Sequence, residues 1–238
     1  MSDLVFVADV HLVEGDAEAE PFHRFLRSLA GRVRTCVIVG DLFNVWIARR
    51  RFLSKDQARL LDVLRETSRR GVTFKYVEGN RDYFVGESWG GDPFAEVAGD
   101  RLEERAGPAR ILASHGDLVN LADRQYRLWR AATRSVAARG LLSLLPSGTG
   151  RALANGLEAR LRGTNMRHKG SLPEPMLRDY ARRAFTAGFS HVVLGHFHQE
   201  TRMELEGGTL WILPDWRAGR RYLRFDASGQ PRFEAFEA

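Results

Sequence analysis

Five short apolar segments, spread along the whole chain, each end in a small cluster of polar residues suited to binding metals. The segments are 5–8, 37–39, 74–77, 111–114 and 192–194. The clusters that follow them are Asp9-Val10-His11, Gly40-Asp41, Gly79-Asn80-Arg81-Asp82, His115-Gly116-Asp117 and Gly195-His196-Phe197-His198. Short runs of this kind predict buried β-strands, and ligand sites in open α/β sheets lie at the carboxyl ends of strands. We therefore expect the five clusters to converge on one site.

The segments between these strands have helical periodicity. Apolar residues at helical spacing predict helices over 17–30 and 54–70, the second with Ser54 as its N-cap and Gly71 as its stop. A short helix is expected over 93–98 and another helix over 174–187. Strands are expected at 4–8, 35–39, 73–77, 109–113, 190–194, 209–213, 221–225 and 231–236, the last three in a β-meander. This alternation predicts a layered α/β body.

Between residues 118 and 172 the strand pattern disappears, and leucines lie among arginines. From 120 to 170 the chain has ten Arg or Lys residues against two acidic residues, although the whole chain carries only +6. We expect a helical insertion of two or three short helices over 118–172, within a core formed by 1–117 and 173–238. The basic segment suits phosphate, anionic lipid or nucleic acid, or it is simply a solvated helical surface.

Cysteine content and hydropathy narrow the cellular setting. The one cysteine, Cys36, cannot form an intramolecular disulfide or a cysteine-rich zinc site, and we expect it to be buried. The region near Met1 lacks the pattern of a signal peptide. No apolar run approaches the roughly 20 residues that a membrane-spanning helix needs. These features predict a cytoplasmic protein that is soluble or peripherally attached to a membrane.

The clusters together offer two carboxylates, one amide oxygen and four imidazoles. The seven residues are Asp9, His11, Asp41, Asn80, His115, His196 and His198. Seven groups exceed the four of a structural zinc site and suit two divalent ions that share a carboxylate. Mixed imidazole and carboxylate ligands favour Mn²⁺, Fe²⁺ or Zn²⁺ over Mg²⁺. Each cluster alone also has a structural interpretation, for example Asn80 as a turn residue.

Histidine spacing adds two expectations. His196 and His198 are two residues apart, so they would point to the same side of an extended chain. His23, His168 and His191 lie outside the clusters, and we expect them to be core or surface residues rather than ligands.

The series of clusters, in this order, resembles the calcineurin-like metallophosphoesterase superfamily along nearly the whole chain. The resemblance implies a layered β-sandwich flanked by helices. It also implies that Asp9, His11, Asp41 and His198 hold one metal ion, that Asp41, Asn80, His115 and His196 hold the other, and that Asp41 bridges them. Asp41, Asn80 and His115 would act in catalysis, and Asp82 would support its neighbours rather than bind metal.

Three longer stretches resemble UDP-2,3-diacylglucosamine diphosphatases of lipid A biosynthesis. They are Gly40-Asp41-Leu42-Phe43 with Trp46-Ile47, the stretch 79–86, and His115-Gly116-Asp117 with Asp123 and Tyr126. This resemblance implies attack of a metal-bound hydroxide on the α-phosphorus, giving UMP and 2,3-diacylglucosamine 1-phosphate, with Mn²⁺ as the expected metal. It makes 118–172 a helical lid over two acyl chains. The implied substrate-binding residues are Asn80, Arg81, Asp123, Tyr126, Asn165, Lys169 and His198.

The same resemblance implies a UDP-linked glycolipid substrate and peripheral contact with the anionic cytoplasmic face of the inner membrane. No nucleic-acid partner and no obligate protein partner are expected. The chain departs from the family at Asn44, where an acid is usual, at the basic stretch 48–51, and at Gln199-Glu200. These departures leave open another nucleotide-linked or lipid substrate. A non-catalytic scaffold is the remaining alternative, although such a protein would be free to lose ligands and none is missing here.

Overall fold

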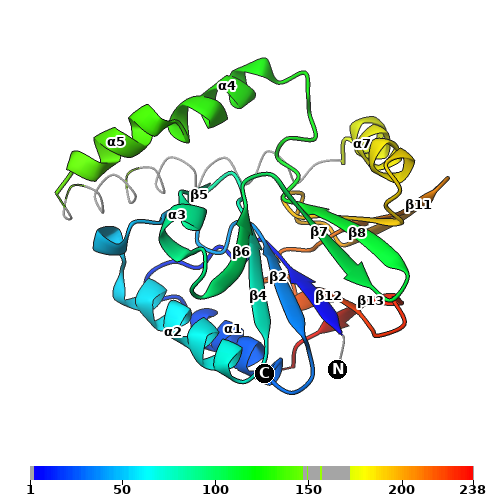
Figure 1. Ribbon diagram of the computed structural model, residues 1–238, viewed down its shortest axis with the longest axis horizontal. Coiled ribbons are helices and arrows are strands. Elements are labelled where there is room, and N and C mark those ends of the chain that lie inside the picture. The colour runs from blue at the N-terminus through cyan, green and yellow to red at the C-terminus, as the bar shows by residue number, and fades with distance from the viewer. Residues whose placement is uncertain (1–2, 147–148, 150–155, 157–171, 238) are drawn as a thin grey trace.

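A six-stranded sheet forms the first half of the core in the computed structural model, which describes residues 3–146, 149, 156 and 172–237 (Figure 1). Its strand order is β13-β12-β1-β2-β4-β6. The bounds are β1 (Leu4–Val7), β2 (Thr35–Val39), β4 (Thr73–Val77), β6 (Phe94–Ala98), β12 (Arg221–Phe225) and β13 (Pro231–Ala235). Strands β1, β2, β4 and β6 run parallel, and β12 pairs antiparallel with β1. The parallel strands therefore all end at the same edge.

A five-stranded sheet packs against the first, in the order β10-β11-β9-β8-β7. Its strands are β7 (Arg101–Ala106), β8 (Ala109–Ser114), β9 (His191–Leu194), β10 (Thr201–Leu205) and β11 (Gly208–Ile212). Strands β8, β9 and β11 are parallel, and β7 and β10 are antiparallel edge strands. A separate two-stranded parallel sheet joins β3 (Trp46–Ile47) and β5 (Asp82–Tyr83).

Successive side chains of each strand point to opposite faces of its sheet, and this alternation forms the layers. In β1, Leu4 and Phe6 face the second sheet and share a buried cluster with Ile111 and Val193. Val5 and Val7 face the other way, into the core beneath α1 (Ala19–Ser28) and α2 (Lys55–Arg69). Helix α7 (Glu174–Thr186) covers the outer face of the second sheet. The result is a helix–sheet–sheet–helix sandwich, which confirms the predicted layered α/β fold.

Helix α2 shows how local sequence sets an element's ends. Ser54 accepts a hydrogen bond from the Gln57 backbone at 3.2 Å, and the Gln57 side chain accepts from the Ser54 backbone at 3.1 Å. This reciprocal cap satisfies two backbone N–H groups that the first turn leaves unpaired. Gly71, with φ +96°, follows the C-terminus in a conformation that only glycine adopts freely. Both predicted boundary signals are confirmed.

Two predictions about secondary structure are wrong. Residues 93–98 are not a helix, because 94–98 form strand β6 beside β4, where Phe94 pairs with Phe74 and Glu96 with Lys75. The helix-favouring alanines and glutamate were outweighed by tertiary pairing. The C-terminal strands are not one meander either. Strand β11 pairs with β9 and β10 in the second sheet, whereas β12 and β13 form a hairpin in the first.

Helices α4 (Arg124–Thr133) and α5 (Val136–Leu144) occupy the described part of the stretch 118–172 and lie at one end of the sandwich (Figure 1). Leu142, Leu145 and Ala138 pack on a small cluster whose members are Val45, Ile47, Phe52, Tyr83 and Phe84. Other apolar side chains of these helices are exposed, among them Leu128, Val136, Leu141 and Leu144. The expected division of the chain at 118 and 172 stays a prediction.

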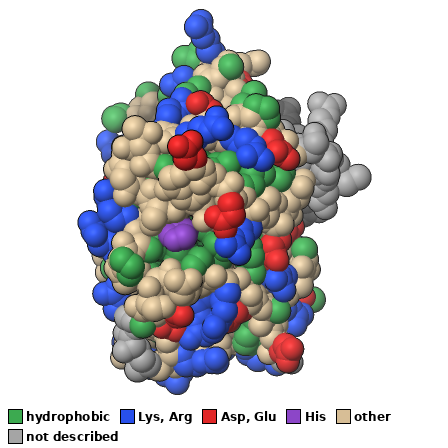
Figure 2. Space-filling view, turned by 90° about the vertical axis from the view of Figure 1, so that its right-hand side faces the viewer, with side chains coloured by type: hydrophobic (Ala, Val, Ile, Leu, Met, Phe, Trp, Pro, Cys, Tyr) green, Lys and Arg blue, Asp and Glu red, His purple; other side chains and the backbone are tan. Residues whose placement is uncertain are grey.

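Two short helical turns complete the described elements, α3 (Val85–Trp89) and η1 (Arg50–Phe52). On the face drawn in Figure 2, acidic and basic side chains are interspersed, and hydrophobic groups lie between them. Within the described residues, no helix has the length and apolar character needed to cross a membrane.

Candidate metal centre

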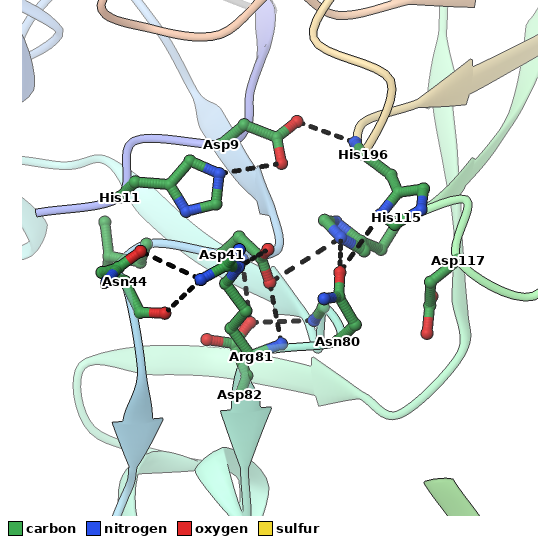
Figure 3. Close-up of polar contacts among 12 residues, drawn as sticks. Asp9, His11, Asp41, Asn44, Asn80, Arg81, Asp82, His115, Asp117 and His196 are labelled. Carbon is green, nitrogen blue, oxygen red and sulfur yellow. Dashed lines mark hydrogen bonds and ion pairs between the residues drawn. The ribbon is translucent and has the colours of Figure 1, made fainter. Parts of the chain in front are cut away.

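The five clusters meet at the carboxyl edge of the two sheets, as expected (Figure 3). Beyond the end of β1, its loop runs beside the loop that follows β2. The Asp9 N–H donates to the Gly40 carbonyl at 3.2 Å, and the His11 N–H donates to the Asp41 carbonyl at 3.0 Å. These hydrogen bonds extend the pairing of the two strands and place their polar side chains next to each other.

Five of the seven predicted ligands have left-handed backbones. The φ angles are 53° at Asp9, 50° at His11, 53° at Asp41, 69° at His196 and 57° at His198. Non-glycine residues adopt this region rarely, and such strain gathers at functional sites. The chain at 196–198 is therefore not extended. The spacing argument for its two imidazoles therefore does not apply, although both reach the same centre, His196 beside Asn80 and His198 beside Asp9 and His11.

Asp9, His11 and His198 form the first candidate metal group. Asp9 Oδ1 lies 3.7 Å from His11 Nε2 and 3.5 Å from His198 Nε2, and the two Nε2 atoms are 3.4 Å apart. Asp9 Oδ2 accepts a hydrogen bond from the His196 N–H at 2.8 Å, whereas the buried Oδ1 has no hydrogen-bond partner among the described residues. A buried carboxylate oxygen facing two imidazole nitrogens is suited to a divalent cation.

Asp41 and His115 belong to a second group, which also contains Asp9. His115 Nε2 lies 3.7 Å from Asp41 Oδ1 and 3.0 Å from Asn80 Oδ1. His196 Nδ1 lies 3.1 Å from the same Asn80 oxygen. All seven predicted ligands thus converge, although in this geometry the residue common to both groups is Asp9. The bridging role of Asp41 stays a prediction.

Glycines in the clusters allow this close approach. A Cβ atom on Gly79 would lie 2.2 Å from Asp41 Oδ1, and one on Gly40 would lie 2.4 Å from His115 Nδ1. A Cβ on Gly195 would meet Asp9 Oδ2 at 3.0 Å. Real Cβ atoms do not approach other heavy atoms to 2.2–2.4 Å. The glycines are therefore needed to bring the ligand-bearing loops together.

The protonation equilibria reflect how closely these groups are packed. Burial raises the pKa of the Asp9 and Asp41 carboxyls above their usual range. Burial lowers the pKa of His11 well below its ordinary value. Burial alone would also lower the pKa of His115, but the carboxylates of Asp41 and Asp9 raise it to about 9. Burial thus disfavours the ionised forms of the Asp9 and Asp41 carboxyls, and a divalent cation would favour them.

Asp82 stabilises two of the ligand loops through hydrogen bonds to their backbone. Its Oδ2 accepts hydrogen bonds from the Asp41 N–H at 2.9 Å, from the Gly79 N–H at 2.8 Å and from the Tyr76 hydroxyl at 2.8 Å. Burial and the neighbouring Asp41 raise the pKa of Asp82 to about 6. One carboxylate therefore joins two ligand loops, which agrees with the expected supporting role.

Asp215 is a site residue that sequence reasoning missed. Its Oδ2 lies 3.3 Å from His198 Nδ1, so it can fix the ring orientation that turns Nε2 toward Asp9. Arg217, two residues on, donates to the His11 carbonyl at 3.0 Å. A signal was present, because Asp215 follows the end of β11 just as the other clusters follow their strands. The expected meander placed that strand elsewhere.

Arg81 and Asn44 form a buried pair beside the metal groups (Figure 3). Arg81 Nη1 donates to the Asn44 carbonyl at 3.1 Å and to Asn44 Oδ1 at 3.0 Å, and its Nε lies 3.5 Å from Asp41 Oδ2. The residue that departs from the family pattern is thus a direct partner of the arginine expected to bind phosphate.

The other predicted substrate-binding residues have different surroundings. Asp123 is exposed and caps α4, accepting from the Tyr126 N–H at 2.8 Å. The Tyr126 hydroxyl donates to Asp117 Oδ2 in a short hydrogen bond. Asn165 and Lys169 lie outside the described residues. The substrate contacts expected for these four residues stay predictions.

The histidines outside the clusters that the structure describes lie away from the centre, as expected. His23 is buried beside Glu20, and His191 Nδ1 accepts from the Trp211 indole at 3.2 Å. His168 lies outside the described residues.

Relatives of known name match most of the chain, although no family model matches it. A UDP-2,3-diacylglucosamine hydrolase of Haemophilus influenzae is 28% identical over an alignment of 242 positions, covering 97% of this chain and 98% of the relative. A protein of the same name from Neisseria meningitidis serogroup B is 29% identical, covering 96% of each chain. One from Ralstonia nicotianae is 28% identical, covering 89% of this chain and 82% of the relative.

Solved structures are similar in fold. A novel archaeal phosphodiesterase gives a TM-score of 0.52 at 11% identity, covering 98% of this chain and 99% of its own. A Thermotoga maritima protein solved by NMR gives a TM-score of 0.51 at 15% identity over the whole of both chains. The chain thus shares its layered α/β fold with the archaeal phosphodiesterase, and its sequence is similar over nearly its full length to proteins named UDP-2,3-diacylglucosamine hydrolase.

Proposed function

We propose that this protein is a hydrolase that cleaves the pyrophosphate bond of UDP-2,3-diacylglucosamine, giving UMP and 2,3-diacylglucosamine 1-phosphate. The main support is the convergence of Asp9, His11, Asp41, His115 and His198 at one edge of the sheets. This geometry occurs in a chain whose relatives of that name match almost end to end. Fold similarity alone would not select the substrate, since one fold serves many reactions.

The centre is proposed to hold two divalent metal ions. Asp9, His11, Asp41 and His198 would hold one, and Asp41, Asn80, His115 and His196 the other. The unpartnered Asp9 Oδ1, which faces two imidazoles, supports the first site. Mn²⁺ is proposed as the native ion, with Fe²⁺ and Zn²⁺ also compatible with these ligands. When bound, such a pair supplies Lewis acidity and a water of lowered pKa.

The chain's own residues would orient the diphosphate. Arg81, whose guanidinium lies between Asp41 and Asn44, is proposed to stabilise negative charge on the phosphate that is cleaved. Asn80 and His198 are proposed to contact the substrate as well as the metal. His115 is proposed to act with Asp41 and Asn80 on the reacting phosphate. Arg81, Asp41 and His115 are buried, which keeps bulk water away from them and strengthens their electrostatic effect.

The stretch 118–172 is proposed to act as a lid over the acyl chains, and Asp123, Tyr126, Asn165 and Lys169 to contact the substrate. Leu128 and Leu144 are 72% and 81% exposed, which makes apolar surface of α4 and α5 accessible. Together with the arginines of this stretch, such surface suits peripheral attachment to the anionic cytoplasmic face of the inner membrane. Co-sedimentation with anionic and with neutral vesicles tests this attachment, and equal binding to both would contradict it.

Incubation of the purified protein with UDP-2,3-diacylglucosamine and Mn²⁺ tests the activity directly. UMP release is expected, and the Asp41→Ala variant should lose it. Absence of UMP from a protein that binds Mn²⁺ would refute the substrate assignment.

The Asn44–Arg81 pair favours one alternative within the same fold. Another nucleotide-linked or lipid substrate could suit the altered charge beside Arg81. A panel of nucleotide-linked diphosphates, compared by kcat/KM, distinguishes the two proposals. Preference for a substrate without acyl chains would support the alternative.

A further inference from the structure

Arg130 of α4 is tied to the loop that carries His115. Its side chain is buried, and Nη1 donates to Asp117 Oδ2 at 2.7 Å. Its Nη2 donates to the Gly99 carbonyl at 2.6 Å and to Asp100 Oδ1 at 3.2 Å. Asp117 follows His115 by two residues. This arginine therefore joins the helix, the β6–β7 turn and one ligand loop.

Arg134, one helical turn further on, is tied to the loop that carries Asn80. Its Nη2 donates to the Gly79 carbonyl at 2.7 Å and to the Asp82 carbonyl at 2.8 Å. The guanidinium also lies over the Tyr83 ring, 5.0 Å from its centroid. One carbonyl precedes residue 80 and the other follows residue 82, so a single nitrogen holds both ends of the segment 80–82.

The two loops held in this way bring their side chains together. His115 Nε2 lies 3.0 Å from Asn80 Oδ1, and the Arg81 N–H donates to Asp41 Oδ1 at 3.0 Å. Residues four apart lie on the same side of a helix, so Arg130 and Arg134 reach both loops from one face of α4. A shift of that face would change the separation of Asn80 and His115.

We propose that Arg134 is a positioning residue, which acts with Arg130 to fix the Asn80 loop against the His115 loop. Helix α4 is then a fixed wall of the metal centre rather than a part that moves away from it. The inference rests on the proposed function only in requiring that these loops bind divalent ions. It does not depend on which nucleotide or lipid is the substrate.

Arg134→Lys and Arg134→Met test the proposal, with Arg127→Met as the matched control. Lysine keeps the charge but not the planar guanidinium, and methionine keeps only the apolar stem. Arg127 lies on the same helix, is exposed, and donates to the Leu121 carbonyl in its own segment. The readouts are amide hydrogen exchange over 78–83, Mn²⁺ titration by calorimetry, and hydrolysis of a small aryl phosphodiester.

In Arg134→Met, the rate of amide hydrogen exchange over 78–83 should rise, and the affinity for one Mn²⁺ should fall by roughly 10- to 100-fold. Arg134→Lys should give intermediate values. The kcat for the aryl phosphodiester should fall with little change in KM. Arg127→Met should match the wild type in exchange and Mn²⁺ binding. If Arg134→Met does not fold, Arg134→Lys decides.

Exchange and Mn²⁺ affinity equal to the wild type in every folded Arg134 variant would overturn the proposal. These readouts do not use the UDP-linked lipid. Failure of the proposed substrate would therefore leave the aryl phosphodiester and Mn²⁺ results intact, and the two failures are distinguishable.

Discussion

Replacing Gly79 with alanine should disable the metal centre through a steric clash with Asp41. The new Cβ would lie 2.2 Å from Asp41 Oδ1 and 2.9 Å from the Asp41 backbone nitrogen. Gly79 does not have a left-handed φ, so its backbone conformation is open to alanine. The substitution therefore tests close approach without adding backbone strain. Because an ordinary contact is about 3.4 Å or longer, the Asp41 carboxylate would have to move by about 1 Å.

The expected magnitude follows from what holds that carboxylate. Overpacking a buried site costs about 1–3 kcal/mol. Displacement of Asp41 Oδ1 would also weaken its hydrogen bond from the Arg81 N–H, now 3.0 Å, and bonds to charged groups contribute about 1.5–3 kcal/mol. We expect the free energy of unfolding of metal-free protein to fall by roughly 2–5 kcal/mol. Mn²⁺ affinity should fall by at least about tenfold.

Urea unfolding in EDTA and Mn²⁺ calorimetry measure both effects. Gly99→Ala is the matched control, because Gly99 also lacks a left-handed φ and a Cβ there meets no atom within 4 Å. The control should be close to neutral. If Gly79→Ala unfolds at the same urea concentration as Gly99→Ala and binds Mn²⁺ with unchanged affinity, the steric argument is refuted.

Three further predictions concern protonation, the Arg81 pair and a helix cap. Because the pKa of His115 is raised to about 9 in the fold, its protonation stabilises metal-free protein below about pH 6.5. That contribution to the free energy of unfolding, up to roughly 3 kcal/mol, should be lost as the pH rises from 6.5 to 9. Urea unfolding of His115→Gln over this pH range tests the prediction, and a pH dependence equal to that of the wild type would contradict it. Asn44→Asp would place against Arg81 Nη1 the acid that is usual at this position in the resembled family, so KM for the UDP-lipid should stay the same or fall, with little change in kcat, whereas a KM raised by about tenfold would favour a different substrate. Ser54→Ala removes the cap of α2 and should cost about 1 kcal/mol in urea unfolding without altering Mn²⁺ affinity.

The ligand-bearing strands could be predicted because their signal is local. A short apolar run followed at once by Gly-Asp or Gly-Asn contains both the strand and its polar end, so neither depends on distant parts of the chain. The cap at Ser54 and the stop at Gly71 are equally local. The layered fold then followed from the alternation of these strands with helices.

What could not be predicted depends on tertiary partners. Strand β6 has a helix-favouring composition, and only its position beside β4 makes it a strand. The hairpin of β12 and β13 joins the first sheet because β12 pairs with β1, more than 200 residues earlier in the sequence. Asp215 and Arg134 reach the centre from β11 and α4, and no spacing rule links them to the clusters.

The five ligands with left-handed backbones show why the centre needs tertiary support in addition to its local sequence signals. A non-glycine residue in that conformation costs about 1–3 kcal/mol, and it persists only where its surroundings hold it. Five such residues, packed with carboxylates whose pKa values burial raises, make a centre that the fold must support against its own preferences. The support comes from Asp82, Arg217 and the arginines of α4, which hydrogen-bond to backbone atoms of the ligand loops or to Asp117 beside His115. Sequence patterns therefore identify the groups that would meet a cation, whereas the residues that hold those groups in place become visible only in three dimensions.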